Sequence, residues 1–315
     1  MPDVLTLGEV MACLRADGQV RLGGTARMSV AGAEANVAIG LTRLGHDVVF
    51  VGAVGPDQLG ELVRRTLRAE GVGIDAIRTD PAQTGIVVFE QRVAGLTRVD
   101  YHRHGSAGAR LSVSDVAEAF EAIPAPPRIL HITGVTPALG EGPERAVRAA
   151  VRLARAAGAR VCLDVNHRNR LWSETLARQV LTELAAEADI VIASDDELPL
   201  AAAGDDEASR VRTLLAGGVA EVVVKRGPAG ATVFTADQTL TLPARPVTAV
   251  DVIGAGDAFV AGYLSGLLDG LPLDGRLARA ITTGAFAVGG HGDWEGAPTR
   301  AELSMLDLPD GTAVR

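Results

Sequence analysis

The chain has 315 residues, of which 47% are hydrophobic, and its formal net charge is −9. This length suits one large domain or a domain with a small attachment. The acidic balance argues against a nucleic-acid surface, which needs clustered Lys and Arg, and no uncharged apolar run reaches membrane-spanning length. The two cysteines, Cys13 and Cys162, indicate no disulfide framework. Because the N-terminus has no basic, apolar leader, we expect a cytoplasmic protein without membrane or nucleic-acid partners.

Short β-branched runs alternate with longer helical patterns along most of the chain. This rhythm predicts an α/β fold, a three-layer α/β/α domain with a mostly parallel sheet. Ligands of such sheets bind at the carboxyl ends of the strands. In chain order, the predicted elements are a strand at 3–8, a helix at 33–45, a strand at 47–55, a helix at 59–71, a strand at 128–134, a helix at 143–158, strands at 160–166, 188–194 and 220–227, and a helix after residue 254.

Two segments, at about residues 11–30 and 84–106, interrupt the alternation. The second contains two runs with strand character and no helix between them, joined at 93–97 by residues typical of a hairpin turn. We interpret both segments as a small β-sheet that projects from the core as a lid. Exposed strands at a sheet edge often pair with another subunit, so we expect a homo-oligomer, a dimer or higher. The core then comprises residues 1–10, 31–83 and 107–315.

Two patterns suggest sites that we reject. The sequence GVGIDA at 71–76 fits a loose dinucleotide-binding pattern, but it follows a predicted helix and is typical of a helix C-terminus. His102 and His104 alternate on a predicted strand and could share a metal ion. Because no third ligand lies nearby in the sequence, we interpret them as a solvated pair.

Residues 251–259 read DVIGAGDAF and lead directly into an apolar helical run. The backbone N–H groups of Gly254, Ala255 and Gly256 would then lie at a helix N-terminus and form an anion site that a phosphate can approach closely. We expect the neighbouring Asp257 carboxylate to stay ionised and to accept a proton from a hydroxyl that attacks the phosphate. The alternative interpretation is a tight turn followed by an ordinary charged helix start.

Three motifs together carry a family resemblance: DVIGAGDAFVAGYL from residue 251, AGAEANVAIGLTRLG at 31–45 with VGAVGPDQLG at 51–60, and VVVKRGPAG at 222–230. In this order, over nearly the whole chain, they resemble the ribokinase-like (PfkB-type) sugar kinases. The resemblance implies an α/β core with a small β lid, with Asp257 as catalytic base and the N–H groups of Gly254, Ala255, Gly256 and Asp257 as anion hole. It also implies a nucleotide site at Ser194, Lys225, Arg226, Gly227, Gly230, Gly254 and Gly256.

The resemblance further implies that the cofactors are ATP and Mg²⁺, with K⁺ in many members. The family's N-x-x-E motif helps to hold magnesium through water, and it corresponds to SDDE at 194–197. Glu197 is therefore carried over with more weight than Ser194, whose hydroxyl can still bond a metal-bound water. A monovalent cation would lie beside Asp251.

Residues 101–109, 163–172 and 289–298 resemble more narrowly the 2-keto-3-deoxygluconate kinases, which phosphorylate the terminal hydroxyl of a six-carbon keto acid. Arginine binds a carboxylate with a planar fork, so Arg103 and Arg168 would clamp the acid when the lid closes. Val87 stands where some of these kinases have tyrosine, which leaves the galactonate epimer open. The resemblance assigns the substrate to Gly32, Asn36, Tyr101, Arg103, Arg168 and Asp293.

Two other functions stay open at this point. A kinase of a neutral sugar such as fructose or ribose would share Asp257, but Arg103 and Arg168 would then be ordinary surface residues. A non-catalytic sensor of sugar or nucleotide would not need Asp257 as a base.

Overall fold

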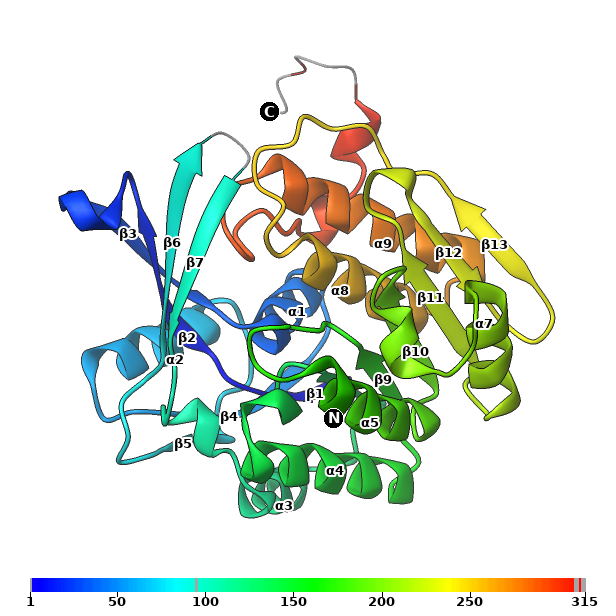
Figure 1. Ribbon diagram of the computed structural model, residues 1–315, viewed down its shortest axis with the longest axis horizontal. Helices are drawn as coiled ribbons and strands as arrows, with labels where there is room; N and C mark the ends of the chain where they lie inside the picture. The colour runs from blue at the N-terminus through cyan, green and yellow to red at the C-terminus, as the bar shows by residue number, and fades with distance from the viewer. Residues whose placement is uncertain (1, 94–95, 309–311, 313–315) are drawn as a thin grey trace.

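The structure is a computed structural model that describes residues 2–93, 96–308 and 312. Within these residues a nine-stranded sheet forms the centre of the molecule (Figure 1). The predicted strands are all present, and β5, β12 and β13 were not predicted. From one edge to the other, the strands are β13 (Thr239–Leu242), β12 (Ala231–Phe234), β11 (Glu221–Lys225), β10 (Ile190–Ser194), β9 (Arg160–Asp164), β8 (Ile129–Thr133), β1 (Val4–Leu7), β4 (Val48–Val54) and β5 (Ile77–Thr79).

The sheet is mostly parallel. Strands β5 to β11 pair in parallel, whereas β12 and β13 run antiparallel at one edge. The chain order of the strands reverses at β1, which lies between β4 and β8. Such a reversal leaves a crevice at the carboxyl ends of the central strands, where ligands of open α/β sheets bind.

Helices cover both faces of the sheet and bury two separate apolar clusters. This arrangement confirms the predicted three-layer architecture (Figure 1). The helices over residues 113–122, 174–186, 198–201, 207–216 and 273–289 were not predicted. One face has α1 (Ala33–Arg43), α2 (Gln58–Ala69), α8 (Ala255–Leu268) and α9 (Leu273–Gly289), and the other has α3 (Val113–Ala122), α4 (Glu141–Ala156), α5 (Glu174–Ala186), α6 (Leu198–Ala201) and α7 (Glu207–Ala216).

Local sequence explains where the predicted helices begin and end. Helix α2 begins after Asp57, whose side chain accepts a hydrogen bond from the N–H of Gly60. Helices α1, α2 and α4 are followed by Gly45, Gly71 and Gly158, whose φ angles of 86°, 82° and 77° are left-handed. The GVGIDA segment is therefore a helix C-terminus, as predicted.

A separate four-stranded sheet projects from the core (Figure 1). Strand β2 pairs antiparallel with β3 and parallel with β6, and β6 pairs antiparallel with β7. Residues 94–95 of the predicted hairpin turn lie outside the described residues. In spatial order the strands are β3 (Ala26–Ala31), β2 (Met11–Ala16), β6 (Ile86–Val93) and β7 (Leu96–His102).

We call this small four-stranded sheet the lid. One face of the lid is apolar. Met11, Cys13, Ala31, Val87 and Phe89 form its buried cluster, and Val99 and Ile253 pack against them. Ile253 belongs to the core, in the turn that precedes α8. The lid therefore covers the crevice at the carboxyl ends of the central strands.

Candidate active site

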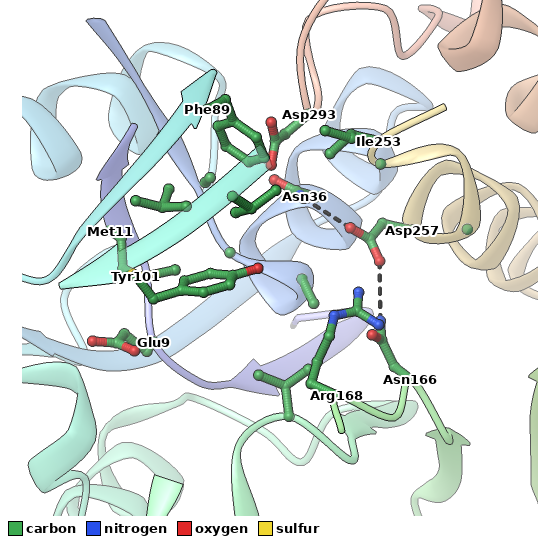
Figure 2. A pocket seen from close by; sticks show the side chains of 18 of the residues that line it. Glu9, Met11, Asn36, Phe89, Tyr101, Asn166, Arg168, Ile253, Asp257 and Asp293 are labelled. Atoms are coloured by element: carbon green, nitrogen blue, oxygen red, sulfur yellow. Dashed lines mark hydrogen bonds between the residues drawn. The ribbon is translucent and has the colours of Figure 1, made fainter. Parts of the chain in front are cut away.

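A cavity of about 470 Å³ lies between the lid and the carboxyl ends of the core strands (Figure 2). Its lid wall is mainly apolar, with Met11, Val87, Phe89 and Val99 beside Tyr101 and Arg103. Its core wall is polar. The cavity brings together all the predicted substrate residues and much of the predicted phosphate end, namely Gly32, Asn36, Tyr101, Arg103, Arg168, Ser194, Glu197, Lys225, Gly254, Gly256, Asp257 and Asp293.

Asp257 lies in the first turn of α8 and is held between two asparagines (Figure 2). Its Oδ2 accepts a hydrogen bond from Nδ2 of Asn36 at 2.7 Å, and its Oδ1 accepts one from Nδ2 of Asn166 at 3.3 Å. Asn36 comes from α1, and Asn166 follows β9 with a left-handed φ of 37°. Both amide oxygens are buried without a hydrogen-bond partner. They remain available to accept hydrogen bonds from a ligand in the cavity.

The expectation that the Asp257 carboxylate stays ionised is not met near neutral pH. Its side chain is almost completely buried, and this burial raises the pKa of Asp257 from 3.8 to about 7. The bond from Asn36 and the charges of Arg168 and Lys225 lower the pKa, but they do not outweigh desolvation and the nearby Asp164. A carboxyl with a pKa near 7 is well matched to general-base chemistry close to neutral pH.

The turn before Asp257 has the geometry of an anion site. Gly254 has a left-handed φ of 76°, and α8 begins at Ala255, so the first-turn N–H groups lack intrahelical acceptors. The N–H of Ala255 makes only a long contact of 3.4 Å with the carbonyl of Val252. A Cβ placed on Gly256 would lie 3.7 Å from Nζ of Lys225. An ammonium group therefore adjoins the N–H groups, and both favour an anion there.

Lys225, at the end of β11, is fixed by the buried Asp164 at the end of β9. Its Nζ donates to Oδ1 of Asp164 at 2.8 Å. Burial lowers the pKa of Lys225, but Asp164 and Glu197 raise it further, so it lies above its usual range. The lysine is therefore a permanent positive charge beside the anion site.

The other predicted nucleotide residues lie apart from this cavity. Arg226 donates to Glu207 of α7 at 2.8 Å, and Gly227 and Gly230 have left-handed φ angles in the turn between β11 and β12. A Cβ on Gly230 would overlap the carbonyl oxygen of Leu242, so only glycine fits there. These residues flank the β11 end of the site and do not line the described cavity.

Ser194, the last residue of β10, and Glu197, three residues further on, line the cavity. Oε1 of Glu197 accepts from the N–H of His167 and Oε2 from the N–H of Ser194, both at 2.9 Å. Among the described residues no cluster of three or more His, Cys, Asp or Glu could enclose a metal ion. The donors present therefore fit Mg²⁺ only as a water- and phosphate-bound ion that a single carboxylate helps to hold.

Arg103 of the predicted clamp is buried and already paired. Its Nε donates to Oε2 of Glu9 at 2.6 Å, and Ser106 donates to the other oxygen of that carboxylate. The guanidinium lies 5.4 Å from the centre of the ring of Tyr101. Gly32 packs against Glu9, because a Cβ on Gly32 would overlap the carbonyl oxygen of Glu9. Glu9 thus neutralises one of the two predicted carboxylate ligands.

Arg168 is exposed and points toward Asp257 and Asn166 (Figure 2). Among the described residues, its only hydrogen-bond partner is the carbonyl of His167, at 3.1 Å. No carboxylate in this part of the chain forms an ion pair with it. Arg168 acts on Asp257 through its charge but bonds no carboxylate, so its N–H donors stay available to a ligand in the cavity.

Asp251 and Asp293 are both paired with Arg15 of the lid. Nη1 of Arg15 donates to Oδ2 of Asp251 at 2.8 Å, and Nη2 bonds Oδ1 of Asp293. Burial, opposed by Arg15, raises the pKa of Asp293 to about 6. The carboxylate of Asp251 that was predicted to bind a monovalent cation is therefore already bonded to a guanidinium.

Sequence reasoning missed four residues of this site: Glu9, Arg15, Asp164 and Asn166. Three of them had a usable signal, since Glu9, Asp164 and Asn166 are polar residues at the carboxyl ends of predicted strands. Arg15 had none, because only the fold brings it to Asp251 and Asp293.

His102 and His104 are both exposed, as expected for a solvated pair. No helix among the described residues is long and apolar enough to cross a membrane.

Comparisons with known proteins agree over nearly the full length. Residues 1–300 match the model of a family described as pfkB family carbohydrate kinase. The chain is 36% identical over 314 residues to a fructokinase of Klebsiella pneumoniae, covering 95% of this chain and 97% of the relative. It is 32% identical over 310 residues to the 2-dehydro-3-deoxygluconokinase of Bacillus subtilis, covering 96% and 95%. The fructokinase of Vibrio cholerae, solved with fructose, ADP and a calcium ion, superposes with a TM-score of 0.83 at 27% identity, covering 97% of this chain and 99% of that structure.

Proposed function

Because the chain belongs to the pfkB family of carbohydrate kinases, we propose that it phosphorylates 2-keto-3-deoxygluconate at its terminal hydroxyl to give the 6-phosphate. Membership makes it an ATP-dependent sugar kinase. The identity of the sugar is the proposal. Relatives with similar identity are named for 2-dehydro-3-deoxygluconate and for fructose, so the choice depends on the residues of this cavity.

The observation that carries the proposal is the unpaired guanidinium of Arg168 in the cavity beside Asp257. An arginine without an acidic partner favours a substrate that brings its own carboxylate. Arg103 and Tyr101 face the same cavity from the lid. The apolar lid wall suits the methylene carbon of a 3-deoxy sugar better than a further hydroxyl, since an unbonded hydroxyl there would be buried at a cost.

In this reaction, the oxygen of the sugar's terminal hydroxyl attacks the γ-phosphorus of ATP, and Asp257 accepts the proton of that hydroxyl. Asn36 and Asn166 hold the carboxylate in place through its two oxygens. The N–H groups of Gly254, Ala255 and Gly256, with Lys225, stabilise the charge that develops on the transferred phosphoryl group. The closed lid excludes water, which would otherwise compete as acceptor.

Magnesium, when bound with the nucleotide, would neutralise phosphate charge. Glu197 and Ser194 are the residues that would bond its water ligands, and Glu197 keeps lone pairs free for this role. The adenosine would lie beyond Lys225, outside the described cavity and along Arg226, Gly227 and Gly230.

A neutral hexose such as fructose is the second candidate, and one observation favours it. Glu9 already compensates Arg103, so the predicted two-arginine clamp has only one free member in the described cavity. The relative from Klebsiella pneumoniae is named a fructokinase. For such a substrate, Arg168 would bond a hydroxyl or a phosphate oxygen rather than a carboxylate.

The deciding measurement is ADP release with ATP and Mg²⁺ against 2-keto-3-deoxygluconate, its galactonate epimer, fructose and ribose. Turnover of the keto acids, with none of the neutral sugars, supports the proposal. The ratio of the rates with the two epimers then shows which one the enzyme prefers, a choice that Val87 leaves open. Turnover of fructose or ribose alone would overturn the proposed substrate and leave the kinase assignment intact.

Arg168→Ala tests the carboxylate contact directly. Loss of a charge-assisted contact of about 2–3 kcal/mol should raise KM for the acid about 30–150-fold with a smaller change in kcat. Arg168→Lys should recover part of that loss. Arg152→Ala, an exposed arginine of α4 far from the cavity, is the matched control. An unchanged KM in Arg168→Ala would rule out the contact.

We also propose a cytoplasmic homo-oligomer, a dimer or higher. The support is that β3 and β7 are edge strands of the lid and expose Met28 and Leu96. Light scattering of the purified chain would test the oligomeric state.

A further inference from the structure

Arg15 joins the lid to two acidic loops of the core. It lies on β2, and its guanidinium bonds Asp251, in the loop before α8, and Asp293, in the loop after α9. The exposed fractions of the three side chains are 17%, 13% and 8%. Charged groups that are this well buried interact more strongly than an ion pair on an open surface.

The lid is built to present this arginine. Residues 11, 13 and 15 alternate along β2, so Arg15 shares the face of Met11 and Cys13 that covers the cavity. Across the sheet it is in register with Phe89 of β6, and its guanidinium carbon lies 4.4 Å from the centre of that ring. Cation–π contact and strand pairing together fix the direction of the guanidinium.

The two acids that it bonds are mechanically part of the anion site. Oδ1 of Asp251 accepts the N–H of Ile253 at 3.1 Å, which shapes the turn that leads to Gly254. The main chain of Asp293 packs directly on Gly254, because a Cβ on that glycine would overlap the carbonyl oxygen of Asp293. Displacement of either loop would therefore move the start of α8, which carries Asp257.

We propose that Arg15 is a positioning residue of the phosphoryl transfer, which couples lid closure to the arrangement of the anion site by bridging Asp251 and Asp293. When the lid is open, the two carboxylates face each other without their shared counter-ion, and their repulsion loosens the turn at Gly254. When it closes, Arg15 draws both loops together and places the N–H groups for the developing phosphoryl charge. The site is thus completed only over a bound substrate.

This inference rests on the proposed kinase reaction, but not on which sugar is phosphorylated. It deepens that function by adding a residue that is not among those that line the cavity. Its effect should consequently appear in kcat rather than in KM for ATP, because the geometry of the anion site matters most in the transition state.

The test is chemical rescue of Arg15→Ala, assayed with whichever sugar of the panel the unaltered enzyme turns over. We expect kcat to fall roughly 10²-fold, with KM for ATP changed less than about threefold. Guanidinium or ethylguanidinium ions, at concentrations far below those that unfold the protein, should raise kcat of Arg15→Ala at least about tenfold. Arg15→Lys should be intermediate, because one ammonium group cannot bond both carboxylates in the planar fork.

Arg27→Ala is the matched control. Arg27 lies directly across from Arg15 on β3, is exposed, and forms no ion pair in the described part of the chain. We expect this variant to keep kcat within about twofold, with no response to guanidinium.

Two results would overturn the inference. One is an Arg15→Ala variant with kcat close to that of the unaltered enzyme. The other is an Arg15→Ala variant that melts normally, loses kcat and is not rescued, because that outcome would assign the loss to something other than the bridge. If the unaltered enzyme turns over only a neutral sugar, the proposed substrate fails and the Arg15 test proceeds unchanged on that sugar.

Discussion

Asn36 donates a hydrogen bond of 2.7 Å from its side-chain amide to Oδ2 of Asp257, although 221 residues separate them in the sequence. The close packing of α1 against α8 makes this bond possible. A Cβ on Gly40 of α1 would lie 2.7 Å from Cβ of Ala261 of α8, so glycine at this position lets the two helices approach. The N-terminal and C-terminal motifs therefore meet at the carboxyl that serves as the base.

The first prediction concerns the pH dependence of turnover. Burial raises the pKa of Asp257 to about 7, and only the ionised carboxylate can accept a proton. We therefore expect kcat/KM to fall about tenfold for each pH unit below about 7 and to level off above it. Initial rates measured from about pH 5 to 9 check this. A flat profile across neutrality would show that Asp257 does not titrate there.

Asn36→Ala provides the matched test of the cause. The hydrogen bond from Asn36 lowers the pKa of Asp257, so its removal should move the midpoint of the profile to higher pH, by roughly half a unit to one unit. A midpoint that moves down, or stays while kcat changes, would contradict this origin of the pH dependence.

Much of the fold could be predicted because its signals are local. The core strands from β1 to β11, apart from β5, are short runs of buried Val, Ile and Leu separated by helical patterns. The antiparallel edge formed by β12 and β13 was not predicted, because each strand has only four residues, ATVF and TLTL, and neither is a run of buried Val, Ile and Leu. Pairing of β12 with β11, and of β13 with β12, makes them strands, and pairing is not a local property.

The candidate site divides in the same way. Asp257 and the glycines before it belong to one contiguous turn, so the motif carried them. The partners that set their chemistry come from elsewhere: Asp164 raises the pKa of Asp257 from the end of β9, and Glu9 neutralises Arg103 from the end of β1. Burial of Asp257 was not visible in the sequence either, which is why its ionisation was predicted wrongly.

The second prediction separates chemistry from binding. Asp257→Asn keeps the size of the side chain and can still accept the bond from Asn36, but it cannot take a proton. We expect turnover to fall by a factor of 10³ or more, with nucleotide and sugar affinity changed by less than about threefold. Single-turnover assays and calorimetric titration with a non-hydrolysable ATP analogue measure the two quantities. Residual turnover near that of the unaltered enzyme would remove Asp257 from the role of base.

The same substitution should stabilise the fold, and the sign depends on pH. A carboxyl whose folded pKa of about 7 exceeds its unfolded value of 3.8 destabilises the native state at every pH above the unfolded value. The penalty is absent below about pH 4, grows between about pH 4 and 7, and reaches at most about 4 kcal/mol above that. Asp257→Asn should therefore raise the melting temperature at about pH 8 and have little effect at about pH 4. A variant that is less stable at the higher pH would contradict the raised pKa.

The third prediction tests the turn at Gly254. Gly254→Ala has two costs, since φ is 76° and the new Cβ would overlap the carbonyl oxygen of Asp293. Gly270 is the matched control, because its φ is 72° but a Cβ there would meet nothing within 4 Å. Gly270→Ala should cost about 1 kcal/mol of unfolding free energy and leave kcat unchanged. Gly254→Ala should cost more and lower kcat at least about tenfold. Equal effects of the two substitutions would show that contact with Asp293 is unimportant.

The fourth prediction concerns potassium. One oxygen of Asp251 accepts the N–H of Ile253 and the other bonds Arg15, so a guanidinium already supplies the positive charge that an alkali-metal ion would bring. We expect replacement of K⁺ by tetramethylammonium to change kcat of the unaltered enzyme by less than about twofold. In Arg15→Gln the carboxylate of Asp251 loses its counter-ion, so K⁺ should now stimulate turnover. A different result would contradict this: kcat of the unaltered enzyme depends strongly on K⁺, and Arg15→Gln shows no greater dependence. The ion would then bind at Asp251 together with Arg15, and Arg15 would not replace it.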